Sequence, residues 1–307
     1  MLRNNCFLIT GGAGFIGSHL TDRLVAEGAH VAVVDDLSTG RKENVNPAAT
    51  FYELDVSDEG LADVFEKEKP EIVFALAFNT NVPLSVRDPL FDLRSIKCSL
   101  NTFVNAHRFG TKKVILASSS FIYGNTKHLP VTESHPPQSV SPYAISKIAS
   151  EHYLEFFHQT HGLPMVILRY STIYGPRQAG GAMADYIRKI GAGERAEMYG
   201  DGELTRDYVF VDDVVEANLR AISLADDHAD PVFNIGSNRE ITLNELYRTI
   251  ARSLGHADNV PVYKPARPGE MKRFLVSYEK AKVELGWEPR VPLDKGLERI
   301  YSHLSLK

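Results

Sequence analysis

The sequence predicts an α/β protein in which a doubly wound parallel sheet carries a smaller, interleaved C-terminal lobe. Three observations lead to this prediction. Apolar strands alternate with helical segments in the first half of the chain, a glycine-rich turn follows the first strand, and the pattern loosens after Arg169. Apolar strands that alternate with helices favour a parallel sheet covered on both faces.

The strands of the expected sheet are short apolar runs. The first covers residues 7–10 and leads into a helix over 15–28, whose apolar side chains share one face and which stops at Gly28. Further strands are expected at 30–34, 50–54, 72–77, 114–117 and 164–169. Helices are expected between them near 58–68, 90–108 and 143–161, the last of them after Pro142.

After Arg169, glycine- and proline-rich stretches indicate loops. Helices are expected there near 182–192, 212–225 and 242–254. We therefore place one domain at 1–169, with returning segments near 205–237, and assign 170–307 mainly to the second lobe.

Composition excludes several classes of protein. The chain has 307 residues, 43% hydrophobic, and a net charge of −5, so it has no basic nucleic-acid footprint. No run approaches the roughly 18 apolar residues that suggest a membrane span, and residues 1–10 do not resemble a signal peptide, so a cytoplasmic protein is expected. Cys6 and Cys98 are too few for a disulfide framework, and Cys6 is expected to be buried. The histidines show no ligand spacing, so no metal site is expected.

A glycine-rich turn follows the first strand. Gly12-Ala13-Gly14-Phe15-Ile16-Gly17 satisfies G-x-G-x-x-G, and Gly11 allows a second glycine spacing. Glycines there permit a tight turn and close approach of phosphate, and the helix N-terminus favours an anion. The turn therefore predicts a dinucleotide site that includes Gly11, Gly14, Phe15, Ile16 and Gly17.

Acidic residues follow the second and third strands. Asp35 stands about 20 residues after the glycines, where a carboxylate binds an adenosine ribose and disfavours a 2′-phosphate. NAD is therefore expected rather than NADP, although Arg41 lies nearby. Asp36 is either part of this site or a turn or helix-cap residue. Asp55 and Val56 either flank the adenine, or Asp55 is a helix N-cap.

Tyr143 and Lys147 are four residues apart in the helix expected at 143–161, so they share one face. A nearby ammonium favours the phenolate, and we expect it, together with the positive ring of the cofactor, to bring the pKa of Tyr143 down toward about 7. Ser118, Ser119 and Ser120 end the fifth strand, at the edge where such sheets bind ligands. Together with the glycine turn, the pair predicts a nicotinamide-dependent enzyme.

The chain resembles the extended short-chain dehydrogenase/reductase family, in its nucleotide-sugar epimerase/dehydratase branch. The resemblance covers nearly the whole chain and rests on these segments, in order: TGGAGFIG (10–17), DDLSTG (35–40), SSSFIYG (118–124), SPYAISK (141–147), LRYSTIYGPRQ (168–178), GDGELTRDYVFVDDV (200–214), FNIGS (233–237), RPGE (267–270) and LGWEP (285–289). It implies a Rossmann-type domain that binds NAD and a lobe that binds a nucleotide sugar.

The resemblance also implies residue roles. Tyr143 is the base, Lys147 binds the nicotinamide ribose, and Ser119 is the hydroxyl that faces the substrate. Further cofactor contacts are implied for Asp35, Asp36, Ser38, Thr39, Gly40, Asp55, Val56, Leu76, Ala77, Phe78 and Tyr170. Further substrate contacts are implied for Ser120, Thr172, Arg206, Arg267 and Phe274.

Three positions depart from the pattern of the family. Phe78 ends a segment that usually reads His-Leu-Ala-Ala, Ile96 replaces an asparagine, and Thr172 replaces another asparagine near the substrate. The branch members that eliminate water carry acidic residues where this chain has Ser120 and Phe121, so 4-epimerisation is expected ahead of dehydration or decarboxylation.

By the same resemblance, Phe274 occupies a position that limits the room for a 2-substituent, so its bulk favours UDP-glucose and UDP-galactose over UDP-N-acetylhexosamines; UDP-glucuronate ranks third. Relatives usually form homodimers through a four-helix bundle, for which residues 90–108 and 143–161 are the candidates. A non-catalytic NAD-binding relative is the alternative from a different class, and an intact Ser119, Tyr143 and Lys147 set argues against it.

Overall fold

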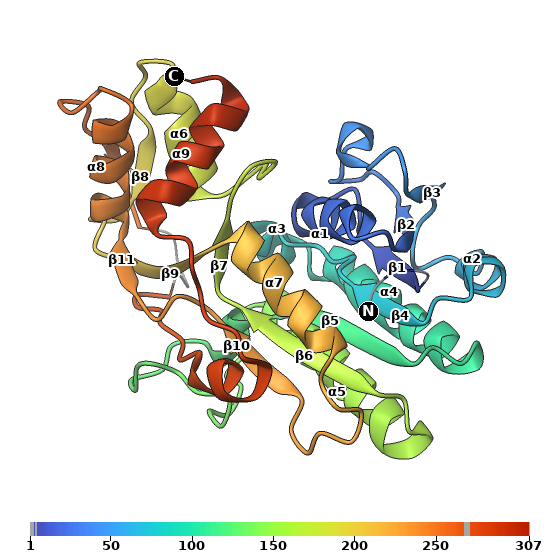
Figure 1. Cartoon of the computed structure of the whole chain (residues 1–307). Helices are drawn as coiled ribbons and strands as arrows, with labels where there is room; N and C mark the ends of the chain where they lie inside the picture. The colour runs from blue at the N-terminus through green and yellow to red at the C-terminus, as the bar shows by residue number, and fades with distance from the viewer. Residues whose placement is uncertain (1–2, 4, 267–270, 307) are drawn as a thin grey trace.

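A seven-stranded parallel sheet forms the centre of the protein (Figure 1). The structure is a computed structural model that describes residues 3, 5–266 and 271–306. Across the sheet the strands run in the order β10 (Val232–Ile235), β6 (Met165–Tyr170), β5 (Lys113–Ser119), β4 (Ile72–Ala75), β1 (Cys6–Thr10), β2 (His30–Asp35) and β3 (Thr50–Glu53). The parallel sheet expected from the sequence is thus confirmed, and β10 adds a strand from the returning segment.

Helices cover both faces of this sheet, as a doubly wound fold requires. On one face, α1 (Phe15–Ala26) and α7 (Val211–Ile222) pack on side chains such as Phe7 and Ile9. On the other, α2 (Leu61–Glu68), α4 (Pro89–Arg108) and α5 (Pro142–His161) pack on side chains such as Leu8. Alternate residues of β1 therefore serve opposite cores.

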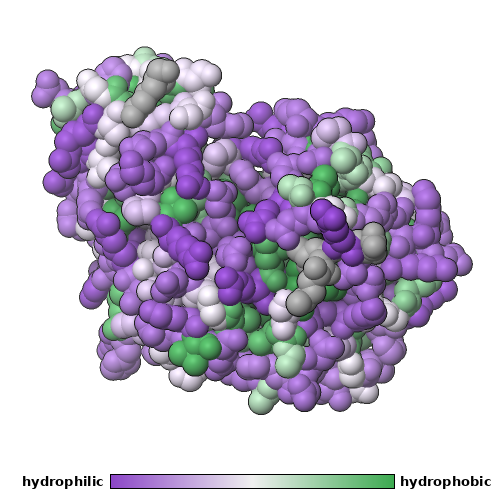
Figure 2. Space-filling view, in the orientation of Figure 1, coloured by the Kyte–Doolittle hydropathy of each residue, from purple (hydrophilic) through white to green (hydrophobic). Residues whose placement is uncertain are grey.

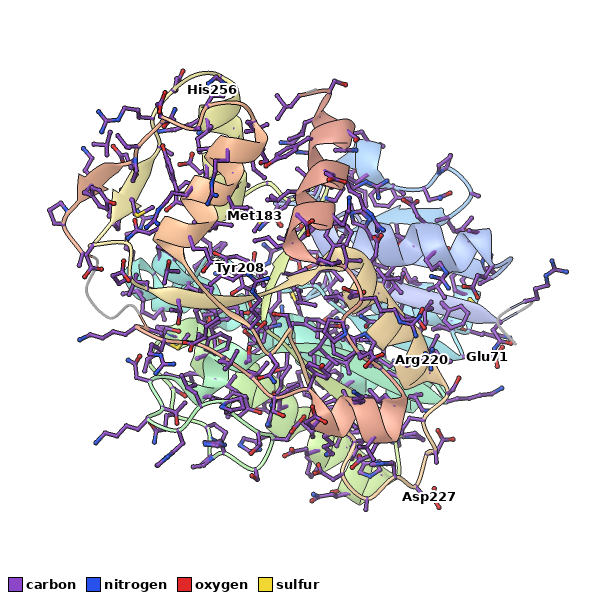
Figure 3. The ribbon with its side chains drawn as sticks, turned by 60° about the vertical axis from the view of Figure 1, so that its left-hand side comes forward. Glu71, Met183, Tyr208, Arg220, Asp227 and His256 are labelled. Carbon is purple, nitrogen blue, oxygen red and sulfur yellow. The ribbon has the colours of Figure 1, made fainter. Side chains whose placement is uncertain are left out.

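The smaller lobe lies at one end of the sheet (Figure 1). Its strands are β7 (Thr172–Tyr174), β9 (Thr205–Phe210) and β11 (Glu240–Thr242) in one sheet, and β8 (Glu197–Tyr199) and β12 (Val262–Lys264) in another. Its helices are α6 (Ala182–Gly191), α8 (Leu243–Ser253) and α9 (Leu293–Leu304). Met183 and Tyr208 belong to its apolar core (Figure 3). The sequence did not predict α9, nor α3 (Val82–Arg87) in the first half.

Local sequence explains where the two long helices α4 and α5 begin. Each starts with a proline that follows a capping residue: the side chain of Asp88 accepts from Phe91 N at 3.0 Å, and that of Ser141 accepts from Ala144 N at 3.2 Å. Proline at the first helical position lacks only an N–H that would have no partner. Within the described part of the chain, no helix is long and apolar enough to span a membrane.

Candidate active site

The glycine turn joins β1 to α1 at the carboxyl edge of the sheet. Gly11 has a φ of +75°, and a Cβ at Gly17 would lie 2.3 Å from Gly11 O, so both positions require glycine. Helix α1 has Gly14 at its N-cap and no side-chain cap. Its first N–H groups are therefore available to an anion, as a pyrophosphate site requires. Leu76 N and Ala77 N lie beside the turn and donate to Thr10 Oγ1 at 3.2 and 3.4 Å.

Asp35 ends β2 directly next to this turn. Its carboxylate accepts from Ala13 N at 3.0 Å and from Leu37 N at 2.8 Å, and a Cβ at Gly40 would lie 2.8 Å from Asp35 Oδ1. Burial raises the pKa of Asp35, while the two N–H donors oppose that change. Asp35 therefore braces the glycine turn as well as standing where a ribose is expected. Ser38 and Thr39 lie exposed on the loop that follows.

Arg94 of α4 joins Asp36 and Asp55, a contact that the sequence did not predict. Its guanidinium donates to Asp55 Oδ2 at 3.0 and 2.7 Å and also contacts Asp36. Burial opposes the charge of Asp36, but hydrogen bonds from Ser38 and Arg94 hold its pKa below the usual value. The N-cap alternative for Asp55 is wrong, because Gly60 precedes α2 and Asp55 instead accepts from the N–H of the serine two residues later.

Tyr143 and Lys147 lie beneath the carboxyl end of β5, on one face of α5, as the sequence predicts. The Tyr143 phenol is hydrogen-bonded to Ser119. Lys147 Nζ donates to Ala117 O at 2.5 Å and lies 3.6 Å from the centre of the Phe78 ring. Phe78 also meets Tyr143 edge to face, with ring centroids 5.7 Å apart. The unusual residue at position 78 is thus packed against both members of the pair.

In the protein alone, burial governs the pKa values of Tyr143 and Lys147. Burial raises the pKa of Tyr143 to about 12, partly offset by the hydrogen bond with Ser119. Burial also lowers the pKa of Lys147 to about 7, against the carboxylates of Glu151 and Asp92. Both shifts favour the neutral form, because charged groups lose solvation inside the protein. Lys147 Nζ lies 6.0 Å from the centre of the Tyr143 ring, and a phenol pKa near 7 stays a prediction for the protein with NAD bound, because the expectation included the positive charge of the nicotinamide ring.

A buried ionic network lies next to Lys147, and the sequence did not predict it. Glu151, one turn further along α5, receives Arg169 Nε at 3.0 Å and Arg169 Nη2 at 2.6 Å, and it also accepts from Ser118 Oγ. Arg169 donates in turn to Tyr123 at 2.8 Å. The pairing of 147 and 151 at helical spacing was visible in the sequence, but the partner on β6 was not.

The second nearby carboxylate, Asp92 on α4, is fully buried and bound as well. It accepts from Asn79 Nδ2 at 3.0 Å and from Ser146 Oγ at 2.5 Å. The two carboxylates that act on Lys147 therefore both have fixed hydrogen-bond donors.

Of the residues implied for substrate binding, Thr172 is placed best. Its Oγ1 is buried and has no hydrogen-bond partner among the described residues, so it is free to bind a ligand oxygen. Arg206 Nη1 donates to Thr205 O and Met271 O at 2.7 and 3.0 Å. Phe274 is buried, with its ring 5.5 Å from that of Phe121.

Several implied contacts are not made by side chains in this structure. Ser120 is fully buried and donates to Tyr170 O at 2.7 Å, so its hydroxyl faces away from the site. The Tyr170 phenol points into the core under α7 and donates to Asn218 at 3.0 Å. Val56 is buried in the opposite core. Arg267 lies outside the described residues.

Comparison with known proteins agrees with this geometry. The NAD dependent epimerase/dehydratase family matches residues 7–236. A UDP-glucose 4-epimerase of Mycolicibacterium smegmatis is 38% identical over 95% of this chain and 96% of the relative. A crystal structure of UDP-glucose 4-epimerase with UDP-glucose from Thermotoga maritima is 42% identical, with a TM-score of 0.94 and 98% of both chains covered.

A further structural relative is the UDP-N-acetylglucosamine 4-epimerase of Methanobrevibacter ruminantium. It is 32% identical, with a TM-score of 0.90, and the match covers 98% of this chain and 99% of that one. The chain therefore belongs to the NAD dependent epimerase/dehydratase family.

Proposed function

We propose that this protein is an NAD-dependent 4-epimerase of UDP-sugars that works through a transient 4-keto intermediate. The observation that carries the proposal is the placement of Ser119, Tyr143 and Lys147 at the carboxyl end of β5, on the same edge of the sheet as the glycine turn. The whole-length similarity to UDP-glucose 4-epimerases supports it.

The residues present fit NAD. The uncapped N-terminus of α1 suits the pyrophosphate, Asp35 suits a free ribose, and Arg94 holds Asp36 and Asp55 on the adenosine side. NAD, when bound, would supply a reversible acceptor for the hydride of sugar carbon 4.

The chain itself handles the proton. Ser119 is hydrogen-bonded to Tyr143, so a sugar 4-hydroxyl near both can pass its proton to the phenol oxygen directly or through the serine. When protonated, Lys147 supplies a positive charge 6.0 Å from the centre of the Tyr143 ring, which favours the phenolate. After the keto sugar turns over, Tyr143 gives the proton back to the new 4-hydroxyl.

The state of the nearby carboxylates favours epimerisation over loss of water. Elimination needs a further acid and base. Glu151 is bound by Arg169 and Ser118, and Asp92 by Asn79 and Ser146, so neither is free for that work.

For the sugar, we propose UDP-glucose and UDP-galactose first and UDP-N-acetylhexosamines second. The rings of Phe121 and Phe274 pack together. We expect them to limit the room for a bulky substituent at carbon 2 of the sugar. The unpartnered Thr172 hydroxyl is a ligand for a sugar or phosphate oxygen.

The test is product analysis with the purified chain and UDP-galactose, UDP-N-acetylgalactosamine and UDP-galacturonate. The expected product has unchanged mass and is inverted only at carbon 4. Tyr143→Phe should keep NAD and lose at least about a thousandfold in turnover, because it lacks the proton carrier. Loss of water or carbon dioxide from the sugar, or normal turnover by Tyr143→Phe, would contradict the proposal.

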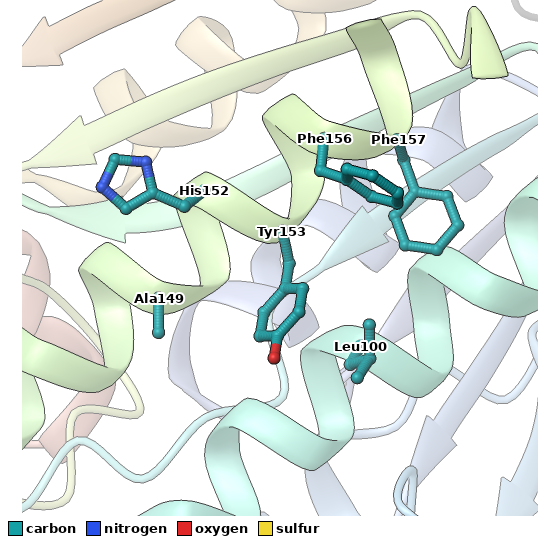
Figure 4. Close-up of a pocket in the computed structure, with 6 residues that line it drawn as sticks. All are labelled: Leu100, Ala149, His152, Tyr153, Phe156 and Phe157. Atoms are coloured by element: carbon teal, nitrogen blue, oxygen red, sulfur yellow. The ribbon is translucent and has the colours of Figure 1, made fainter. Parts of the chain in front are cut away.

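We also propose that the chain acts as a homodimer through α4 and α5. Both helices expose large apolar side chains, among them Leu93 (54% exposed), Val104 (43%) and Phe156 (51%). A groove between them is lined by Leu100, Ala149, His152, Tyr153, Phe156 and Phe157 (Figure 4). The face over α7 is by contrast mainly hydrophilic (Figure 2). A second copy of the same two helices would complete a four-helix bundle and cover this apolar surface.

Light scattering after size exclusion tests the dimer. The natural chain should elute with twice the mass of one chain, and Phe156→Lys should elute as a monomer. Val283→Lys is the matched control, because Val283 is 80% exposed but lies outside α4 and α5. A monomeric natural chain, or a dimer that survives Phe156→Lys, would argue against this interface.

A further inference from the structure

A cysteine, a histidine and a glutamate meet at the amino ends of the strands, on the opposite edge of the sheet from Tyr143. Cys6 begins β1 and His30 begins β2, and the two residues are partners in the parallel register. Glu68 is the last residue of α2. One ligand atom from each lies within 4.8 Å of the others. Contrary to the sequence expectation, Cys6 is only partly buried.

The three side chains are partly held in place. Glu68 is 8% exposed and receives Tyr52 Oη on one oxygen, while its other oxygen lies 2.7 Å from His30 Nε2. His30 is 50% exposed, so its ring can turn without disturbing the core. The carboxylate is therefore fixed, and the imidazole can adjust to a ligand.

The local field favours a cation at this edge. Glu68 ends α2, where the helix dipole is negative and repels a carboxylate. Two lysines lie at the rim of the cluster. Lys112 pairs with Glu71, and Lys67 lies over the Tyr52 ring. Glu71 lies on the sheet half of the molecule, well away from His256 in the small lobe (Figure 3).

We propose that Cys6, His30 and Glu68 form a binding site for a divalent transition metal ion, with Zn²⁺ as the best fit. Thiolate and imidazole select this class of ion over Mg²⁺ or Ca²⁺. Tetrahedral zinc needs ligand atoms about 3.3–3.7 Å apart, and the three ligand atoms here lie within 4.8 Å of one another. Water fills the fourth position. Binding releases the Cys6 thiol proton to solvent, and the neutral His30 ring binds through Nε2 with its N–H on Nδ1.

The ion would join the starts of β1 and β2 to the end of α2. The five residues of β1 separate it from the glycine turn, a distance of about 16 Å at 3.3 Å per residue. The site therefore stabilises the fold and takes no part in the proposed reaction. Its three ligands come from segments far apart in the chain, which is why the spacing of histidines in the sequence did not predict it.

The test uses untagged, NAD-bound protein freed of metal by a chelator and titrated with Co²⁺ and then Zn²⁺. One equivalent of Co²⁺ should give a thiolate-to-cobalt charge-transfer band that Zn²⁺ removes. Cys6→Ser should abolish the band, and His30→Gln and Glu68→Gln should each weaken Co²⁺ binding at least about tenfold. Zn²⁺ should raise the Tm of the natural chain but not that of Cys6→Ser, with kcat unchanged.

Two control variants keep the test specific. Cys98→Ser removes the other cysteine, and His228→Gln removes a histidine that pairs with Glu284 at 3.2 Å without a thiol nearby; both should retain the band. No thiolate band, a band that survives Cys6→Ser, or binding that is unaffected by His30→Gln would overturn the proposal. Affinity should also rise with pH, because the thiol proton is released.

Discussion

Replacing Lys147 by methionine should make the cofactor-free protein more stable, although the proposed reaction needs this lysine. Its pKa falls from 10.5 to about 7 because the side chain is buried. At pH 7 this shift makes folding less favourable by about 4 kcal/mol, at roughly 1.4 kcal/mol per pKa unit. Methionine removes that cost but leaves Ala117 O without its donor, which costs about 1–3 kcal/mol. The expected net gain is about 1–3 kcal/mol.

The pH dependence identifies the cause. Between pH 7 and 10.5 the unfolded chain keeps the lysine proton and the folded chain releases it, so the natural protein becomes more stable as pH rises. From pH 7 to pH 9 Lys147 should contribute about 2 kcal/mol of this rise, and Lys147→Met should lack it. The advantage of the variant should therefore shrink at higher pH.

Urea unfolding followed by fluorescence measures both effects, because the single tryptophan, Trp287, is buried. Lys113→Met is the matched control. Lys113 is also buried, but its Nζ donates to Ile222 O and Leu224 O and pairs with Asp226 at 3.0 Å. Its loss should destabilise the protein. A Lys147→Met protein that is less stable than the natural chain at pH 7, or a gap that does not narrow by pH 9, would refute the reasoning.

Other substitutions test the rest of the site. Arg94→Met should raise the Kd for NAD about tenfold, measured by calorimetry, with kcat unchanged at saturating NAD, because it leaves two carboxylates unpaired. Glu151→Gln should lower the free energy of unfolding by about 3–5 kcal/mol, since it leaves a buried guanidinium without its partner, and adding Arg169→Met should recover part of that loss in the same urea assay. Thr172→Val should leave the Tm nearly unchanged, because its hydroxyl has no partner here, but should raise the KM for the UDP-sugar.

The features that the sequence predicted are those set by short-range pattern. Alternation of apolar runs predicted the sheet, and spacing of four predicted that Tyr143 and Lys147 share a helix face. Asp35 at the end of β2 was likewise expected from its distance to the glycines. These patterns depend on neighbours within one or two elements, so a single sequence contains them.

The features that the sequence did not predict depend on partners far along the chain. Arg94 is 58 and 39 residues from the two carboxylates that it binds, and Arg169 meets Glu151 only because β6 lies beside α5. The Tyr170 side chain points into the core on the face of the sheet that α7 covers, and the register of β6 determines that face. In each case the side-chain type was visible in the sequence, but the packing that selects its partner was not.

The pKa shifts of Tyr143 and Lys147 show why these residues should act as one unit. Burial disfavours both the phenolate and the ammonium, with pKa values of about 12 and about 7. Each charge is therefore costly alone, whereas together they compensate each other in the same buried space. Removing either partner should then remove nearly all of the turnover. The double variant Tyr143→Phe with Lys147→Met should be scarcely slower than either single variant in a kcat assay with bound NAD. If the two losses instead multiplied, Lys147 would contribute by binding the ribose alone and not by stabilising the phenolate.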